Sequence, residues 1–199
     1  MYYKKIITAG NFITVKKIFS ARKGQASPRG HNRSPTPKDV AAVNERHSEE
    51  KLSYLLNANF KKAVDGHLTL TYSKAPQPEE AKKAVEKFLR QARTLYRREG
   101  KELKYVQVTE YKGHRIHHHI VFNDISMYPK LLELWKSGTP HLKVLYSDDL
   151  TELASYLVKE TSKTFKSSEK LFNFENFDYS VDPISLDQKE GAMPANNIS

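Results

Sequence analysis

The chain has 199 residues, enough for one ordinary domain with additional sequence, and its 38% hydrophobic and 28% charged residues allow a packed core beneath a polar surface. It contains no cysteine, which excludes disulfide frameworks, thiolate metal sites and cysteine nucleophiles. No stretch has the length of a membrane span or the pattern of a signal peptide, so we expect a cytoplasmic protein with no membrane partner.

Lysine and arginine outnumber acidic residues by 33 to 23, which gives a net charge of +10. The excess is uneven, because residues 167–199 contain two lysines and six acidic residues, so this tail carries −4 and the rest carries +14. A basic body favours a polyanionic partner, above all nucleic acid. Charge alone also fits a basic protein without such a partner.

Hydrophobic periodicity and turn residues predict the following elements in chain order: a hairpin turning near Gly10-Asn11, a basic loop over 20–39, a helix over 39–61, a strand over 67–72, a helix over 78–98, strands over 103–111 and 115–123, a short helix over 127–138, a strand over 141–147 and a helix over 150–163. Their order predicts an α+β fold with an antiparallel-rich sheet and flanking helices. We expect an N-terminal segment, a core and an acidic tail, over residues 1–63, 64–166 and 167–199.

Three consecutive histidines lie inside the predicted strand RIHHHIVF, residues 115–122. Side chains on a strand alternate between the two faces of its sheet, so His117 and His119 share one face. The other face receives His118 and the apolar residues Ile116, Ile120 and Phe122. Two imidazoles at this spacing can chelate a divalent ion, but a third ligand is needed for more than a weak site.

Glu110 on the preceding strand can supply that third ligand. If Gly113-His114 are the central residues of a type II′ turn, Glu110 lies directly opposite His117 on the same face. A slip of one residue would move Glu110 to the other face. Two histidines and one carboxylate suit Mg²⁺, Mn²⁺ or Zn²⁺ with positions open for substrate oxygens, whereas the alternative is a histidine-rich strand that binds no metal.

The predicted helix over 150–163, LTELASYLVKETSK, has a core-facing apolar stripe and places Tyr156 and Lys159 on its polar face. A tyrosine in such a position is usually only a half-exposed amphipathic side chain. Beside a metal site such a tyrosine can act as a nucleophile, because a neighbouring ammonium stabilises the phenolate of an otherwise weak nucleophile. Attack on a phosphate diester would leave a covalent phosphotyrosine.

The stretches HLTLTY, YVQVTEY, RIHHHIVF and ASYLVKETSK follow the order of the three motifs of HUH endonucleases. Over about residues 67–163 the chain resembles replication-associated proteins that start rolling-circle replication of small plasmids, phages and integrative elements. The resemblance implies a five-stranded antiparallel sheet and nicking of one DNA strand at an origin. It also implies that His117, His119 and Glu110 bind Mg²⁺ or Mn²⁺, that Tyr156 joins the DNA 5′-phosphate with Lys159 assisting, and that the freed 3′-hydroxyl primes synthesis.

Two features depart from the family pattern. The central position of the histidine motif is usually bulky and apolar, whereas here it is His118; the apolar residues that share its face still assign the metal-binding pair to His117 and His119. The helix contains one tyrosine where some initiators have two. A single tyrosine requires a second subunit or reversal of the reaction to close the cycle.

We expect single-stranded or hairpin origin DNA to be held by basic side chains near the site. The candidates lie in the basic loop, beside the hairpin turn and beyond the tyrosine: Arg22, Lys23, Arg29, Arg33, Lys112, Arg115 and Lys163. The arginines of the helix over 78–98 fit a solvated face equally well. Further expected partners are a host helicase, a host polymerase and other copies of the chain on DNA.

Two alternative functions fit the same residues. One is a single-tyrosine transposase, which would use the same chemistry on the hairpin ends of an element. The other is a non-enzymatic DNA-binding protein whose histidines bind a structural metal ion. The acidic tail, residues 167–199, is expected to be largely disordered and to dock a host replication protein or to fold back over the basic groove.

Overall fold

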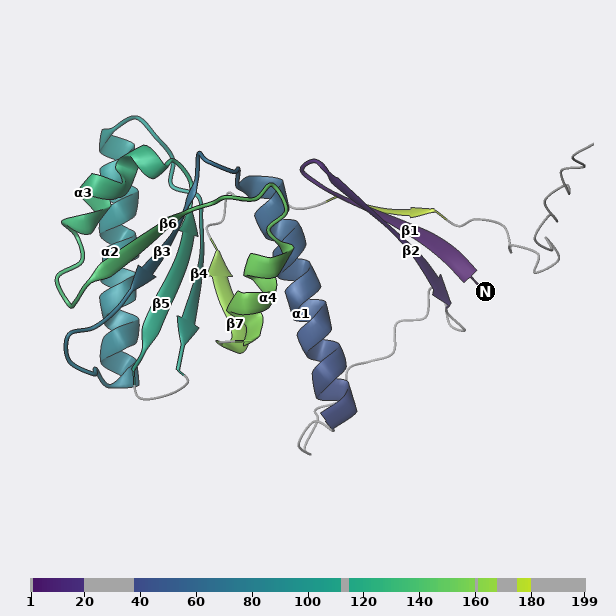
Figure 1. Cartoon of the computed structure of the whole chain (residues 1–199), viewed down its shortest axis with the longest axis horizontal. Coiled ribbons are helices and arrows are strands. Elements are labelled where there is room, and N and C mark those ends of the chain that lie inside the picture. Colours follow the sequence, from purple (N-terminus) through teal and green to yellow (C-terminus); the bar gives the residue numbers. More distant parts are fainter. Residues whose placement is uncertain (1, 20–37, 112–114, 160, 168–174, 180–199) are drawn as a thin grey trace, which may run out of the picture.

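The computed structural model describes residues 2–19, 38–111, 115–159, 161–167 and 175–179. These residues form four α-helices and two antiparallel sheets, so the predicted α+β class is confirmed (Figure 1). In chain order the elements are β1 Tyr2–Ala9, β2 Phe12–Phe19, α1 Lys38–Asn59, β3 Gly66–Leu70, α2 Pro78–Arg98, β4 Tyr105–Glu110, β5 His117–Phe122, α3 Tyr128–Leu132, β6 Pro140–Val144, α4 Thr151–Lys159, β7 Thr161–Ser167 and β8 Glu175–Tyr179. A short 3₁₀ turn, Ile125–Met127, leads into α3.

The main sheet has five antiparallel strands in the order β6-β3-β5-β4-β7. β5 lies at its centre, paired with β3 on one side and with its hairpin partner β4 on the other. This central strand carries the three consecutive histidines, and neighbouring elements cover both of its faces. The alternation of side chains along β5 therefore determines which helical layer each histidine faces.

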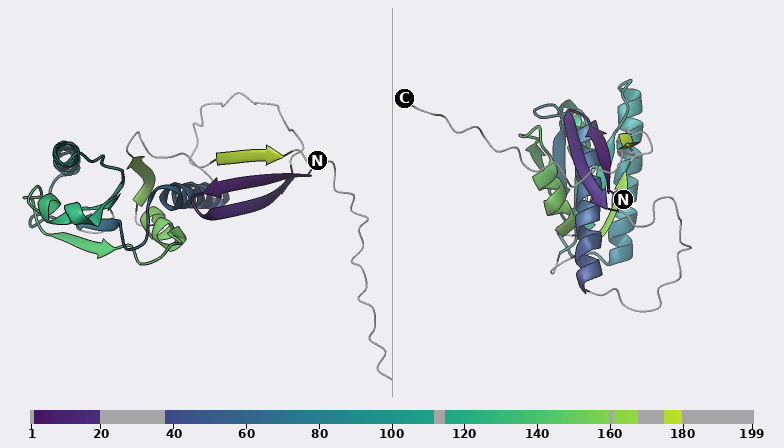
Figure 2. Two further views of the ribbon diagram at one scale, coloured as in Figure 1. Left: turned by 90° about the horizontal axis from the view of Figure 1, so that it is seen from above. Right: turned by 90° about the vertical axis from the view of Figure 1, so that its right-hand side faces the viewer.

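Helices cover the two faces of the sheet as separate layers (Figures 1 and 2). On one face, α2 and the α3 segment bury a cluster that includes Phe88, Tyr96, Ile120, Phe122 and Trp135. On the other face, α1 and α4 bury a second cluster, which includes Leu52, Leu56, Val106, Val121 and Leu157. Residues that alternate along β4 and β5 are thus divided between two cores.

The helix α2 begins and ends where the sequence predicts. Pro78 occupies the first turn, the Gln77 backbone N–H donates to the Glu80 carboxylate at 3.0 Å, and Gly100 follows the helix with φ of +66°. A proline near the start and a glycine past the end are the ordinary boundary signals of a helix. Its buried side chains, Ala81, Val85, Phe88, Leu89, Ala92 and Tyr96, form one stripe.

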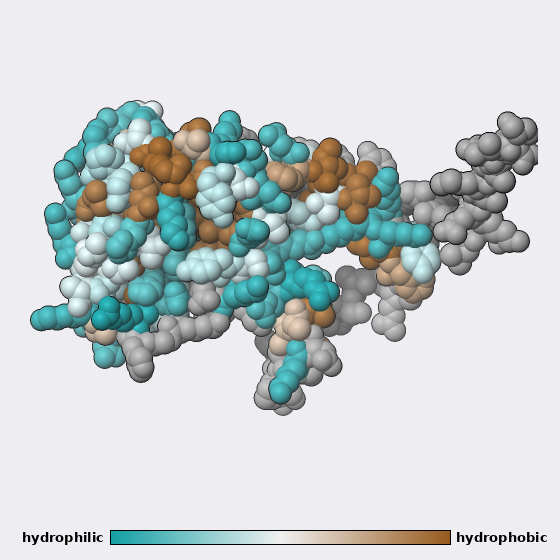
Figure 3. All heavy atoms as spheres, viewed as in Figure 1, coloured by the Kyte–Doolittle hydropathy of each residue, from teal (hydrophilic) through white to brown (hydrophobic). Residues whose placement is uncertain are grey.

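The predicted N-terminal hairpin is confirmed, but it belongs to a second sheet in the order β2-β1-β8. This sheet meets α1, where Ile7 and Ala9 pack on Tyr54 and Lys16 pairs with Glu50. Its outer surface exposes apolar side chains, among them Ile13, Val15 and Phe19. Figure 3 shows hydrophobic residues, in brown, on the surface of the hairpin region.

The predicted helix over 150–163 is wrong at its C-terminal end. α4 ends at Lys159, and residues 161–167 form β7, the fifth strand of the main sheet, which pairs with β4. Threonine and serine, at 161, 162 and 164, are poor helix formers, and the open edge of β4 offers backbone partners that a longer helix would leave unused. Lys163 is therefore on a strand rather than on the tyrosine helix.

The predicted helix over 127–138 is also shorter than expected. α3 ends at Leu132, because the following backbone turns to pair with residues 71–73, through Thr71 N–H to Thr139 O and Ser73 N–H to Ser137 O. The Trp135 indole N–H, buried here, donates to the Thr71 carbonyl at 2.9 Å. A Cβ at Gly138 would lie 2.2 Å from the Thr71 oxygen, so only glycine fits this close approach.

Within the described part of the chain, no helix is both long and apolar enough to cross a membrane.

Leu56 is expected to carry much of the packing of α1 on the sheet, because it is fully buried there. Leu56→Ala should lower the free energy of unfolding by about 2–5 kcal/mol, since it removes buried methyl groups and leaves a cavity. Urea denaturation followed by circular dichroism measures the change. Val43→Ala, at an exposed position of the same helix, should cost less than about 0.5 kcal/mol; equal losses in the two variants would contradict this packing.

Candidate functional site

The register of β4 against β5 brings Glu110 opposite His117 and Val108 opposite His119. This is the register expected from a two-residue turn, and it places the carboxylate on the face shared by the two histidines. The turn itself, residues 112–114, lies outside the described residues, so the predicted type II′ geometry stays a prediction.

Both imidazoles converge on one carboxylate oxygen. Glu110 Oε2 lies 3.5 Å from His117 Nδ1 and 3.3 Å from His119 Nε2. The His119 side chain is 3% exposed and the His117 side chain 31% exposed, so the cluster begins inside the sheet and opens toward solvent at His117. Three side chains from two adjacent strands thus bring two nitrogens and one oxygen together.

The donor set fits a divalent ion in its chemistry. Two imidazole nitrogens and a carboxylate oxygen are borderline ligands that Mn²⁺ and Zn²⁺ accept, and that Mg²⁺ accepts when water or phosphate oxygens complete its shell. Among the described residues, no group of three or more histidine, cysteine, aspartate or glutamate side chains has the spacing to hold an ion as it stands. In this arrangement the Glu110 carboxylate contacts the two imidazoles directly.

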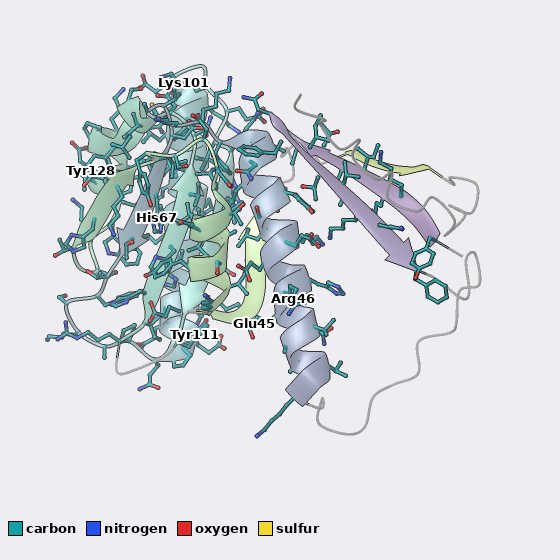
Figure 4. The ribbon with its side chains drawn as sticks, turned by 45° about the vertical axis from the view of Figure 1, so that its right-hand side comes forward. Glu45, Arg46, His67, Lys101, Tyr111 and Tyr128 are labelled. Atoms are coloured by element: carbon teal, nitrogen blue, oxygen red, sulfur yellow. The ribbon has the colours of Figure 1, made fainter. Side chains whose placement is uncertain are left out.

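His67 is a neighbour of this cluster that sequence reasoning missed. It lies on β3 (labelled in Figure 4) and is 6% exposed. Its Nε2 is 3.2 Å from His119 Nδ1. Thr69 Oγ1 lies 3.3 Å from His119 Nδ1 as well. Burial, with His119 and Lys143 nearby, lowers the pKa of His67 to about 3, so this imidazole is neutral near pH 7.

These contacts orient His119. With Nδ1 engaged by His67 and Thr69, the remaining nitrogen, Nε2, faces Glu110. Partners behind a ligating imidazole commonly fix its tautomer and ring orientation. Strand alternation in HLTLTY puts His67 and Thr69 on one face, but the pairing that joins His67 to His119 spans 52 residues and leaves no local sequence signal.

His118 faces the opposite layer of the protein, as the alternation predicts. It is fully buried, with Nε2 2.8 Å from the Tyr72 hydroxyl and Nδ1 2.9 Å from Thr109 Oγ1. Burial, with His119 and His117 nearby, lowers its pKa to about 4. An imidazole at this usually apolar position is accommodated because both of its nitrogens have partners.

Tyr156 reaches the cluster from α4. Its ring meets the His119 ring edge to face, with centroids 5.5 Å apart and planes at 87°, and its side chain is 45% exposed. The helix is anchored at its start, where the Asp149 carboxylate accepts from Thr151 N–H at 2.9 Å and Leu150 N–H donates to Asn57 Oδ1 at 2.8 Å.

Lys159 lies one turn beyond Tyr156, exposed in the last turn of α4. The other sequence-predicted DNA contacts are distributed unevenly. Arg115 is exposed just before β5, while the side chains of Arg22, Lys23, Arg29, Arg33, Lys112 and Lys163 lie outside the described residues. The α2 arginines belong to the opposite layer, where Arg93 donates to the Tyr105 hydroxyl.

One protein-family model, which describes replication-associated proteins of the ORF2 type, matches residues 65–165. The matched segment begins just before β3 and ends within β7, so it contains the histidine strand and the tyrosine helix. No curated protein and no solved structure is significantly similar to the chain.

His118→Leu should keep the affinity for Mn²⁺ within about threefold, because His118 is hydrogen-bonded on the face away from Glu110. His119→Ala should reduce it by about tenfold or more, since one of few ligands is lost. Isothermal titration of each folded variant with Mn²⁺ measures both. Loss of affinity in His118→Leu at an unchanged circular dichroism spectrum would move the metal assignment to His118.

His67→Leu should weaken Mn²⁺ binding by about tenfold, because it releases the Nδ1 side of His119. The matched control is His141→Leu, which removes an exposed imidazole from β6. The same titration compares the two variants, and equal affinities would show that His67 does not orient His119.

Proposed function

Because the chain belongs to the ORF2-type family of replication-associated proteins, whose members are HUH-type rolling-circle replication initiators, we propose that it nicks and rejoins one strand of origin DNA. The observation that carries the proposal is the meeting of Tyr156 with His119. These residues come from α4 and β5, so their contact reflects the folded arrangement and not only the order of motifs. A replication-associated protein binds DNA, and the basic body of the chain suits such a partner.

In the proposed reaction the Tyr156 oxygen attacks the phosphorus of one backbone diester. The bond from phosphorus to the 3′ oxygen breaks, the phenolic proton is lost, and the leaving 3′ oxygen gains a proton. The products are a tyrosyl ester of the DNA 5′-phosphate and a free 3′-hydroxyl, which can prime synthesis. Attack by the 3′-hydroxyl on the tyrosyl ester reverses these changes and rejoins the strand.

Each side chain has a distinct part in this proposal. His117, His119 and Glu110 would hold a divalent ion, Mg²⁺ or Mn²⁺, which supplies charge stabilisation to the phosphate. His67 and Thr69 hold His119 in orientation from the opposite side. Lys159 favours the phenolate through its positive charge one turn away.

We further propose that residues 64–166 form the catalytic unit. The matched segment, residues 65–165, supports these limits. The helix α1 precedes that unit and packs on α4 through Leu52, Leu55 and Leu56, so it supports the tyrosine helix from the N-terminal segment. The described part of the acidic tail, β8, pairs with β1.

A replication initiator is preferred to a transposase because the matched family is replication-associated. A structural metal site is disfavoured because His117 and Glu110 lie at the exposed end of the cluster, beside the half-exposed Tyr156, and not within a closed core.

Tyr156→Phe should abolish covalent attachment to DNA, because the ring is kept and only the attacking oxygen is lost. The protein is incubated with Mn²⁺ and a pool of randomised single-stranded oligonucleotides, and the adduct is separated under denaturing conditions. Chelation of the metal should also prevent adduct formation in the unmodified protein. Tyr111→Phe, which changes another exposed tyrosine near the end of β4, should leave the adduct unchanged.

A Tyr156→Phe protein that still forms the adduct at the normal level would disprove the assignment of the nucleophile. Absence of adduct in the unmodified protein across the whole pool, with both Mn²⁺ and Mg²⁺, would count against the nicking activity itself.

A further inference from the structure

A pocket of about 300 Å³ lies between the end of β6, the segment 145–150 and α4. Tyr156 and His67 both line it, so the pocket shares a wall with the proposed nicking site. DNA whose phosphate reaches Tyr156 therefore passes the mouth of this pocket. The family motifs and the roles proposed above leave the pocket without a function.

The size and walls of the pocket suit one flat aromatic group. Its volume is at the lower limit of about 300 Å³ for small-molecule pockets, which leaves room for a single base. Leu145 and Leu150 are buried and Leu153 is half-buried, so one wall is apolar. Tyr146 lines the pocket with a side chain that is 78% exposed, and such a ring can stack on a base.

The charged residues that line the pocket favour entry of a base over entry of a phosphate. Asp149 and Glu152 both line it, and two carboxylates repel a phosphate group. Lys143, which also lines it, can contact a phosphate that remains outside. A nucleotide at this position is therefore expected to direct its base inward and its backbone outward.

Glu152 is the carboxylate available for reading a base. Asp149 already accepts hydrogen bonds from the Thr151 N–H and hydroxyl, at 2.9 and 2.6 Å. Glu152 takes no hydrogen bond or ion pair within the part of the chain that the structure describes. An ionised carboxylate only accepts hydrogen bonds, so its partner must present N–H groups.

We propose that this pocket receives one nucleobase adjacent to the scissile phosphate, and that Glu152 selects guanine. Guanine presents two neighbouring N–H donors on its Watson–Crick edge, which match the two oxygens of a carboxylate. Thymine presents one N–H between two carbonyl oxygens, which the carboxylate repels, and adenine and cytosine present an amino group beside an acceptor. The adjacency to the nick rests on the proposed function, whereas base selection by the pocket does not.

Base selection is tested by binding, without any nicking. The full chain is mixed with randomised single-stranded oligonucleotides in the presence of a chelator, bound molecules are separated, and their sequences are counted. Guanine should be enriched at one position by about tenfold, as expected for a good bidentate contact. Glu152→Gln should shift that single position toward adenine, which pairs with an amide, and leave the other positions unchanged.

Two further variants distinguish recognition of the base in the pocket from effects of net charge and of folding. Asp148→Asn removes the same charge next to the pocket, whose lining does not include this residue, and should preserve the guanine preference. Leu153→Trp fills the pocket and should flatten the preference at that position, with thermal melting used to verify the fold. Identical preferences at every position in the unmodified protein, Glu152→Gln and Leu153→Trp would overturn the proposal.

The adduct assay then places the position relative to the nick. Selected oligonucleotides are incubated with Mn²⁺, and the 5′ end attached to the protein is sequenced. A nick next to the selected guanine supports adjacency, and a nick several nucleotides away overturns it. Absence of any adduct would contradict the nicking activity and the adjacency together, while the Glu152-dependent preference would still decide base selection.

Discussion

The pairing register between β4 and β5 is the constraint on which the site depends. Side chains alternate along a strand, so a slip of one residue would turn Glu110 away from His117 and leave the two imidazoles without a carboxylate. The same slip would disturb both cores, because Val106 and Tyr105 pack in opposite layers. The hydrophobic pattern that stabilises the sheet therefore also fixes the geometry of the polar cluster.

A second requirement is that α4 pack on this face of the sheet so that Tyr156 contacts His119. α1 provides the support, since it lies outside the segment matched by the family model and yet buries Leu52 and Leu56 against α4 and the sheet. Asn57 of α1 also accepts from the backbone of Leu150 at the start of α4. The exposure of Tyr156 beside His119 is thus a consequence of packing that begins before the matched segment.

Local signals in the sequence predict much of this arrangement, and non-local pairing explains what they miss. Alternation separates His118 from its neighbours, and the spacing around Gly113 predicts the partner of His117. Periodicity extends the tyrosine helix into β7, because the threonines there become strand only through pairing with β4. His67 is missed because β3 joins β5 across about fifty residues, a contact that periodicity does not encode.

The two faces of β5 show how one strand can combine stability with a reactive surface. His118 is fully buried and hydrogen-bonded by Tyr72 and Thr109, so this imidazole costs little more than the apolar residue usual at its position. On the other face, His119 is buried among neutral or hydrogen-bonding groups at its inner side and meets Glu110 and Tyr156 at its outer side. A fully apolar sheet would be more stable but would have no ligands, and a fully polar face would not hold α1 and α4. The polar residues on this face instead gather around His119, beside the half-exposed Tyr156. The pocket that His67, Glu152 and Tyr156 line opens next to them.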